Sequence, residues 1–243
     1  MDGENNFWQV PYKHSAYHFN NNIKDTADGP WFKTIGNFYN HYDIELNYLH
    51  SKYITSKNPN LKPKEITPEF EHIDFINQTT RHVNKGTDAE KTLTCVNFYE
   101  RPDMFPKLYE LVHNFGLEFF DNPENIPGLT GKYGVKIHYQ IPGNMYVMHI
   151  DEGLYNLDID HSRLVRIHVM LEDWVPGQFI IYGNYNYQDW KAGDAHVFRW
   201  GDTPHATANA SNHPRSTIQI TGLKTDRTRE IIANASRDTI FKL

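Results

Sequence analysis

The chain has 243 residues, of which 39% are hydrophobic and 14% aromatic, with a formal net charge of −6. This length suits one domain with a full core, and a modest charge without a basic block gives no support to a nucleic-acid surface. No apolar run is long enough to span a bilayer, and the acidic start lacks the basic and apolar regions of a secretory signal, so we expect a cytoplasmic protein without membrane attachment. Because Cys95 is the only cysteine, a metal site must use His, Asp or Glu.

Residues 1–130 are expected to form a helical or irregular support that holds much of the substrate specificity. Residues 31–49 are aromatic-rich and of ambiguous period, residues 56–70 indicate a loop, and residues 91–100 have the β-branched and aromatic content of a strand. The most regular helix is predicted over residues 101–120. Its apolar positions recur at helical spacing, and two prolines lie near its start: Met104, Leu108, Leu111, Val112 and Phe115, with Pro102 and Pro106.

After about Gly131 the pattern changes to short runs rich in Val, Ile, Tyr and Phe, separated by turn residues. The predicted strands cover residues 133–141, 145–150, 163–171, 178–183, 194–200 and 216–222. Short strands at close spacing with Pro-Gly and Asn-rich turns indicate a sandwich or barrel of antiparallel strands. We therefore expect one domain over residues 1–243, with a β core at 131–223 and a C-terminal extension at 224–243.

Three His-x-Asp pairs raise the question of a metal site. Side chains two apart on a strand point to the same side, so such a pair can offer two ligands to one ion. The spacing alone is weak evidence in a chain with fourteen histidines, where it occurs three times: His41/Asp43, His72/Asp74 and His149/Asp151. A further feature is needed to separate them.

An arginine at a fixed distance from another histidine supplies that feature. A mononuclear iron oxygenase site uses two His and one carboxylate and leaves positions for a cosubstrate and O₂. If the cosubstrate is a dicarboxylate, its distal group needs a buried cation, and arginine matches a carboxylate with two parallel hydrogen bonds. Only one histidine in the chain, His205, has an arginine ten residues later, Arg215, and this pair lies in the β-rich part. The combination selects His149/Asp151.

The segment from about Gly131 to Leu223 resembles the double-stranded β-helix of Fe(II)/2-oxoglutarate-dependent oxygenases. It is most similar to the branch of aspartyl/asparaginyl β-hydroxylases and bacterial proline hydroxylases. The residues that support the resemblance are "HYQIPGNMYVMHID", "RLVRIHVMLED" and "WKAGDAHVFRWGDTPHATANASNHPRSTIQI". It implies an α+β fold with a jelly-roll, cupin-like core and a helical N-terminal layer. Because Asp151 is present, where the animal β-hydroxylases lack the carboxylate ligand, the chain is closer to the bacterial enzymes.

The resemblance also implies roles for individual residues. His149, Asp151 and His205 would bind Fe(II), and Arg215 would anchor 2-oxoglutarate. Arg166 and His168 share one face of a strand, and the resemblance implies that such a pair contacts the carboxylates of substrate or cosubstrate. Arg166 is therefore a candidate for binding the substrate and His168 for binding the cosubstrate. Tyr139 is a further candidate for the cosubstrate, with its neighbours His138 and Gln140 as alternatives.

The implied reaction hydroxylates an unactivated C–H bond of a free amino acid or of an amino-acid side chain in a peptide. 2-Oxoglutarate and O₂ would be consumed, and succinate and CO₂ released. Residues 153–162 are a candidate lid. Two alternatives remain open at this point: a metal-binding cupin that acts as an isomerase or hydrolase, and a non-catalytic β-sandwich interaction module.

Overall fold

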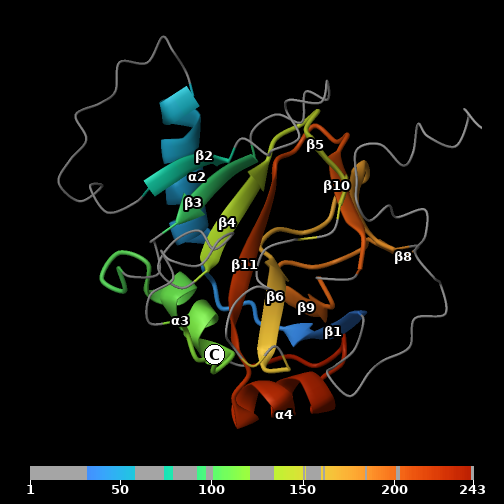
Figure 1. Cartoon of the computed structure of the whole chain (residues 1–243). Coiled ribbons are helices and arrows are strands. Elements are labelled where there is room, and N and C mark those ends of the chain that lie inside the picture. The colour runs from blue at the N-terminus through green and yellow to red at the C-terminus, as the bar shows by residue number, and fades with distance from the viewer. Residues whose placement is uncertain are drawn as a thin grey trace, which may run out of the picture.

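A computed structural model describes residues 32–57, 74–78, 92–96, 101–120, 134–149, 151, 160, 162–183, 185–200 and 203–241. Two antiparallel sheets form the body of the protein (Figure 1). The larger has the order β1-β9-β6-β11-β4-β3-β2, and the smaller has the order β5-β10-β7-β8. The strands are β1 (Phe32–Asn37), β2 (Asp74–Gln78), β3 (Thr92–Val96), β4 (Val135–Gln140), β5 (Met145–His149), β6 (Leu164–Met170), β7 (Gln178–Tyr182), β8 (Tyr185–Tyr187), β9 (Asp194–Phe198), β10 (His205–Asn209) and β11 (Arg215–Leu223).

Strands β4 to β11 form the jelly roll. Four of these eight strands lie in each sheet: β9, β6, β11 and β4 are neighbours in the larger one, and β5, β10, β7 and β8 make up the smaller one. The chain crosses between the sheets repeatedly, as in a double-sheet jelly roll. The predicted double-stranded β-helix is therefore confirmed by the strand order, with β1 added at one edge of the larger sheet and β3 and β2 at the other.

Within the described residues three helices accompany the sheets: α2 (Asp43–Lys57), α3 (Pro106–Asn114) and α4 (Asp226–Asn234). Apolar side chains of all three pack on one face of the larger sheet, including Leu49, Leu111 and Ile231. This outer face is formed by the strand residues whose side chains point away from the smaller sheet, such as Ile137 and Ile218. In the described residues no helix combines the length and the apolar character needed to cross a membrane.

The other face of the larger sheet is turned toward the smaller sheet, and it is polar at several buried positions. Strand β11 is buried on both faces from Arg215 to Gly222, with polar residues alternating with the apolar ones that face the helices. Burying polar groups is costly unless they find partners, so a polar interior between two sheets is the part of this fold where function is expected.

The predicted elements differ from the observed ones in identifiable ways. The helix expected over residues 101–120 spans only 106–114, because it begins at a proline in its first turn and ends before Gly116, whose φ is 65°. The ambiguous segment 31–49 contains both β1 and the start of α2. That helix runs to Lys57, into the predicted loop, whose residues 58–70 lie outside the described part of the chain. Strands β2, β8 and β10 and helix α4 were not predicted.

Candidate metal centre

The structure brings His149, Asp151 and His205 together. His149 ends β5 and His205 begins β10, and the antiparallel register pairs these two residues directly. One ligand atom from each of the three residues lies within 4.8 Å of the other two, and no second group of this kind occurs in the described residues. Asp151 Oδ1 is 3.4 Å from His149 Nε2, and Asp151 Oδ2 is 3.8 Å from His205 Nε2. The three predicted ligands can therefore reach one ion.

The charges around Asp151 keep its carboxyl group ionised. Burial alone would raise its pKa, but Arg166, His205 and His149 together hold the pKa well below its usual value. Burial also lowers the pKa of His205 to about 4, so this imidazole is neutral at pH 7. His205 Nδ1 lies 3.1 Å from the carbonyl oxygen of Thr203, which leaves Nε2 directed at Asp151. A deprotonated carboxylate and neutral imidazoles are the states that bind a divalent metal.

Arg166 contacts the metal centre through the aspartate. Its Nη1 forms an ion pair with Asp151 Oδ2, and its Nε donates to Thr221 Oγ1 at 3.1 Å. The guanidinium carbon lies 4.3 Å from the centre of the Trp200 ring, and the side chain is buried. These contacts orient the carboxylate. The suggested role of Arg166 in binding a substrate carboxylate stays a prediction, since its Nη1 is paired with Asp151.

Arg215 lies at the opposite end of the inner face from Arg166. It begins β11, and its side chain crosses to the smaller sheet, where Nη1 donates to the carbonyl oxygen of Phe179 at 3.0 Å. Nη2 donates to Gln140 Oε1, while Nε is buried without a hydrogen-bond partner. Burial lowers the pKa of Arg215 to about 10, so the group is still charged at neutral pH. In the described residues no carboxylate forms an ion pair with it.

His168 and Tyr139 lie on opposite faces of the larger sheet. His168 is on the inner face, between Tyr182 Oη at 3.3 Å and Gln219 Oε1 at 3.4 Å. Tyr139 instead packs in the core under the helices, edge-on to the His50 ring at 4.9 Å. The suggestion that Tyr139 contacts a cosubstrate is not supported by this position, because strand alternation turns Tyr139 away from the metal centre.

Strand alternation places other residues of β4 on the inner face. Gln140 is hydrogen-bonded to Arg215, and His138 Nε2 lies 3.4 Å from Gln219 Oε1. The sequence offered both as alternatives to Tyr139. Lys136 was not singled out at all, although the period of two along the strand already groups it with these residues. A further buried contact that was missed joins Tyr182 Oη to His196 Nε2 at 2.6 Å.

The buried neutral histidines predict that the protein loses stability in mild acid. Burial lowers the pKa of His196 to about 3, and burial followed by the nearby Lys136 charge lowers that of His138 to about 3. The unfolded chain takes up protons near pH 6.5, so between pH 6.5 and 3 it binds more protons than the folded protein. Stability from these groups is complete above pH 6.5 and falls as the pH decreases.

Urea unfolding at pH 7.0 to 5.0 measures this effect in a range where most carboxyl groups stay ionised. We expect the free energy of unfolding to fall over this range, and His196→Gln to make the fall shallower. His213→Gln is the matched control, because His213 is exposed. A free energy that stays constant from pH 7 to 5 in the wild-type protein would contradict the prediction.

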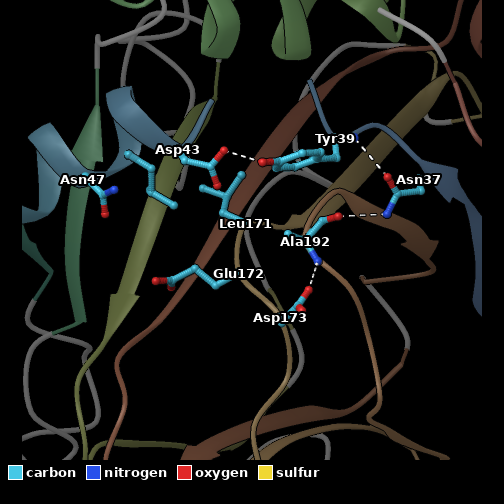
Figure 2. A pocket seen from close by; sticks show the side chains of 9 residues that line it. Asn37, Tyr39, Asp43, Asn47, Leu171, Glu172, Asp173 and Ala192 are labelled. Carbon is cyan, nitrogen blue, oxygen red and sulfur yellow. Dashed lines mark hydrogen bonds between the residues drawn. The ribbon is translucent and has the colours of Figure 1, made fainter. Parts of the chain in front are cut away.

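The structure also contains a pocket of about 510 Å³ (Figure 2). It is bordered by the start of α2 and by the turns that follow β6 and precede β9, and Asp43, Glu172 and Asp173 line it. Asp43 accepts a hydrogen bond from Tyr39 Oη, and Asp173 accepts one from the backbone N–H of Ala192 at 2.9 Å. None of the three predicted metal ligands lines this pocket. Of the other two His-x-Asp pairs, His41/Asp43 therefore lies in another part of the molecule, and His72 lies outside the described residues. Residues 153–159 and 161 of the candidate lid also lie outside them.

Comparisons with known proteins give similarities to solved structures only. No family model matches the chain, and no curated protein matches it. Three of the similar structures are a predicted oxalate decarboxylase from Thermotoga maritima (17% identity, TM-score 0.27, 37% of this chain and 65% of the other), a cupin protein from Bacteroides fragilis (17%, 0.28, 38% and 66%) and a non-heme monooxygenase in a ThoJ–nickel complex (18%, 0.31, 37% and 42%).

The matched parts cover about two thirds or less of these three structures. Their names describe a decarboxylase, a cupin and a monooxygenase, and these activities belong to those proteins. At such identities and TM-scores the similarity says nothing about the activity of the present chain. The jelly-roll assignment rests on the order and pairing of its own strands.

Proposed function

We propose that this protein is an Fe(II)- and 2-oxoglutarate-dependent dioxygenase that hydroxylates a free amino acid or an amino-acid side chain. The proposal depends above all on Arg215, a buried guanidinium that has an unpartnered Nε and no carboxylate among the described residues. A buried charge without a counter-ion is costly, and an anionic ligand that binds there would offset the cost. A metal-dependent isomerase or hydrolase has no need for such a cation near its metal.

The position of Arg215 suits a short dicarboxylate that reaches from the metal centre. The guanidinium donates to the backbone of Phe179, and His205 pairs in register with Tyr182, three residues further along β7. Three strand residues span about 10 Å. A five-carbon dicarboxylate could therefore place one end at the metal ligands and the other at Arg215.

The donor set fits the proposed metal. Two imidazoles and one carboxylate that occupy one side of an ion form the set typical of mononuclear Fe(II) oxygenases, and they leave positions for a cosubstrate and O₂. Asp151 is ionised and His205 neutral, as metal binding requires. When bound, Fe(II) with 2-oxoglutarate would supply the oxidising power, with succinate and CO₂ as products.

The residues of the chain would position the metal and the cosubstrate and exclude water from the site. Arg166 holds the Asp151 carboxylate through its ion pair. Thr203 fixes the orientation of the His205 ring through the contact to Nδ1. Arg215 would hold the distal carboxylate of the cosubstrate, and Gln140 holds the Arg215 guanidinium in place. Each of these groups is set before a ligand arrives, which is the condition for precise positioning.

The test is an anaerobic titration of the metal-free protein with Fe(II) and then with 2-oxoglutarate. Chelation by a 2-oxo acid should produce a weak visible charge-transfer band. Glutarate lacks the 2-oxo group and should give no band, and pyruvate lacks the distal carboxylate and should require a much higher concentration. If folded protein that binds Fe(II) gives no band, the 2-oxoglutarate assignment is wrong. A band that forms at the same concentration of pyruvate as of 2-oxoglutarate would show that Arg215 does not bind the distal carboxylate.

A further inference from the structure

Lys136 is a second buried cation on the inner face of the larger sheet. It lies on β4 with only 8% of its surface exposed. The residue opposite it on β11 is Gln219, and opposite Gln219 on β6 is His168, so these two strands place no carboxylate in its row. Within the described residues, Lys136 takes part in no ion pair or side-chain hydrogen bond.

The charges near the metal centre do not balance. Lys136, Arg166 and Arg215 are buried cations, whereas Asp151 is the carboxylate that the described residues place among them. Arg166 already forms an ion pair with Asp151. Burial, and next the charge of Arg166, lower the pKa of Lys136 to about 8, while Asp151 acts in the opposite direction. The amine is therefore mostly protonated at pH 7, and no carboxylate of the described residues forms an ion pair with it.

Lys136 is well separated from the site proposed for the cosubstrate. Its partner on β11, Gln219, is four residues from Arg215, which corresponds to about 13 Å along the strand. Lys136 and Arg166 lie on the two strands that flank β11, and both affect the pKa of His138 together with Asp151. A ligand at Arg215 would thus leave the charge of Lys136 without a counter-ion among the described residues, and a second anion would supply one.

We propose that Lys136 binds the carboxylate of the substrate, so that the substrate is a small carboxylic acid that enters the inner face beside β4. This inference rests on the proposed oxygenase function and narrows it: a free amino acid, with its own carboxylate, fits better than a side chain within a peptide. Lys136 then takes the role that the resemblance suggested for Arg166, whose Nη1 is paired with Asp151.

The first test uses the metal-free protein and needs no ligand. Lys136→Met keeps the length of the side chain and removes its charge, and Lys136→Arg keeps the charge. If the charge is unpaired, Lys136→Met should raise the midpoint of thermal unfolding by about 2–4 °C. A lower midpoint for Lys136→Met would mean that a carboxylate of the chain itself pairs with the lysine, and the proposal would be wrong.

The second test adds acetate as a probe to the anaerobic protein with Fe(II) and saturating 2-oxoglutarate. Thermal unfolding is followed at constant ionic strength against chloride, with neutral acetamide as the matched control. Acetate should stabilise the wild-type protein and Lys136→Arg and should have at most a third of that effect on Lys136→Met. Acetate that stabilises no form, or that stabilises Lys136→Met as well as the wild type, would overturn the proposal.

The same samples separate this inference from the proposed function. The 2-oxoglutarate concentration at half-maximal charge-transfer band should change less than threefold in Lys136→Met. A tenfold or larger increase would assign Lys136 to the cosubstrate instead and overturn the inference. If the wild-type protein gives no band at all, the oxygenase proposal has failed. Anion binding at Lys136 can then still be tested, by comparing the stabilisation that acetate gives to Lys136→Met and to Arg215→Met in the presence of Fe(II).

Discussion

Replacing His205 by alanine should abolish tight metal binding. His205 is directly opposite His149 in the strand register, and its Nε2 faces the Asp151 carboxylate. Two remaining ligands do not hold a divalent ion as three do. The affinity for the metal should fall by more than the roughly 10–100-fold that is lost when a residue hydrogen-bonded to a metal ligand is removed, because here a ligand itself is removed. Anaerobic dialysis against Fe(II) followed by elemental analysis gives the stoichiometry.

The control is His213→Ala, which removes an exposed histidine eight residues away in the sequence. It should keep one ion per chain, and its midpoint of thermal unfolding should still rise when metal is added, because a ligand that binds only the folded state stabilises it. His205→Ala should lose this dependence on metal. Equal metal content in both variants would show that the three residues do not form a metal site.

Replacing Arg215 by methionine should raise the 2-oxoglutarate concentration at half-maximal chelation by about 100-fold or more. A hydrogen bond to a charged group contributes about 1.5–3 kcal/mol, and a guanidinium can offer two to one carboxylate. In the same variant, binding of pyruvate should change little, because pyruvate has no distal carboxylate. The anaerobic charge-transfer band measures both.

Two further variants complete this experiment. Arg215→Lys keeps a cation but loses the planar fork, so its affinity for 2-oxoglutarate should fall between those of the wild type and Arg215→Met. Arg229→Met removes an exposed arginine, whose partner Asp226 is exposed as well, and should leave binding unchanged. If Arg215→Met binds 2-oxoglutarate as the wild type does, the buried guanidinium serves another purpose.

Much of the candidate site could be predicted because its pattern is local. The spacing in His149-x-Asp151 follows from strand alternation, and the interval from His205 to Arg215 follows from a short connection between two strands that lie in different sheets. Such intervals are fixed by backbone geometry and remain readable in one sequence. The six predicted strands in the second half correspond to β4, β5, β6, β7, β9 and β11 for the same reason.

The residues that were missed depend on contacts between distant segments. Strand β10 has the sequence HATAN, which contains no large β-branched or aromatic residue apart from the histidine ring, and its extended form comes from pairing with β5 on one side and β7 on the other. Tyr139 was named as a candidate for the cosubstrate beside His138 and Gln140, and it lies on the face of β4 that the helices cover. Alternation divides a strand into two faces, but only the packing of the helices decides which face is the core.

The sequence by itself indicated which side chains could bind a metal, which arginine could bind an anion, and where short strands would form. These follow from residue type and from spacings within one strand or one turn. Only the tertiary structure decided which polar groups are buried and which of them are paired. It joined Arg166 to Asp151, and among the described residues it gave Arg215 and Lys136, both buried, no carboxylate as an ion-pair partner. Burial and charge balance are properties of segments far apart in the chain, and it is the cost of an unpaired buried charge that points to a ligand.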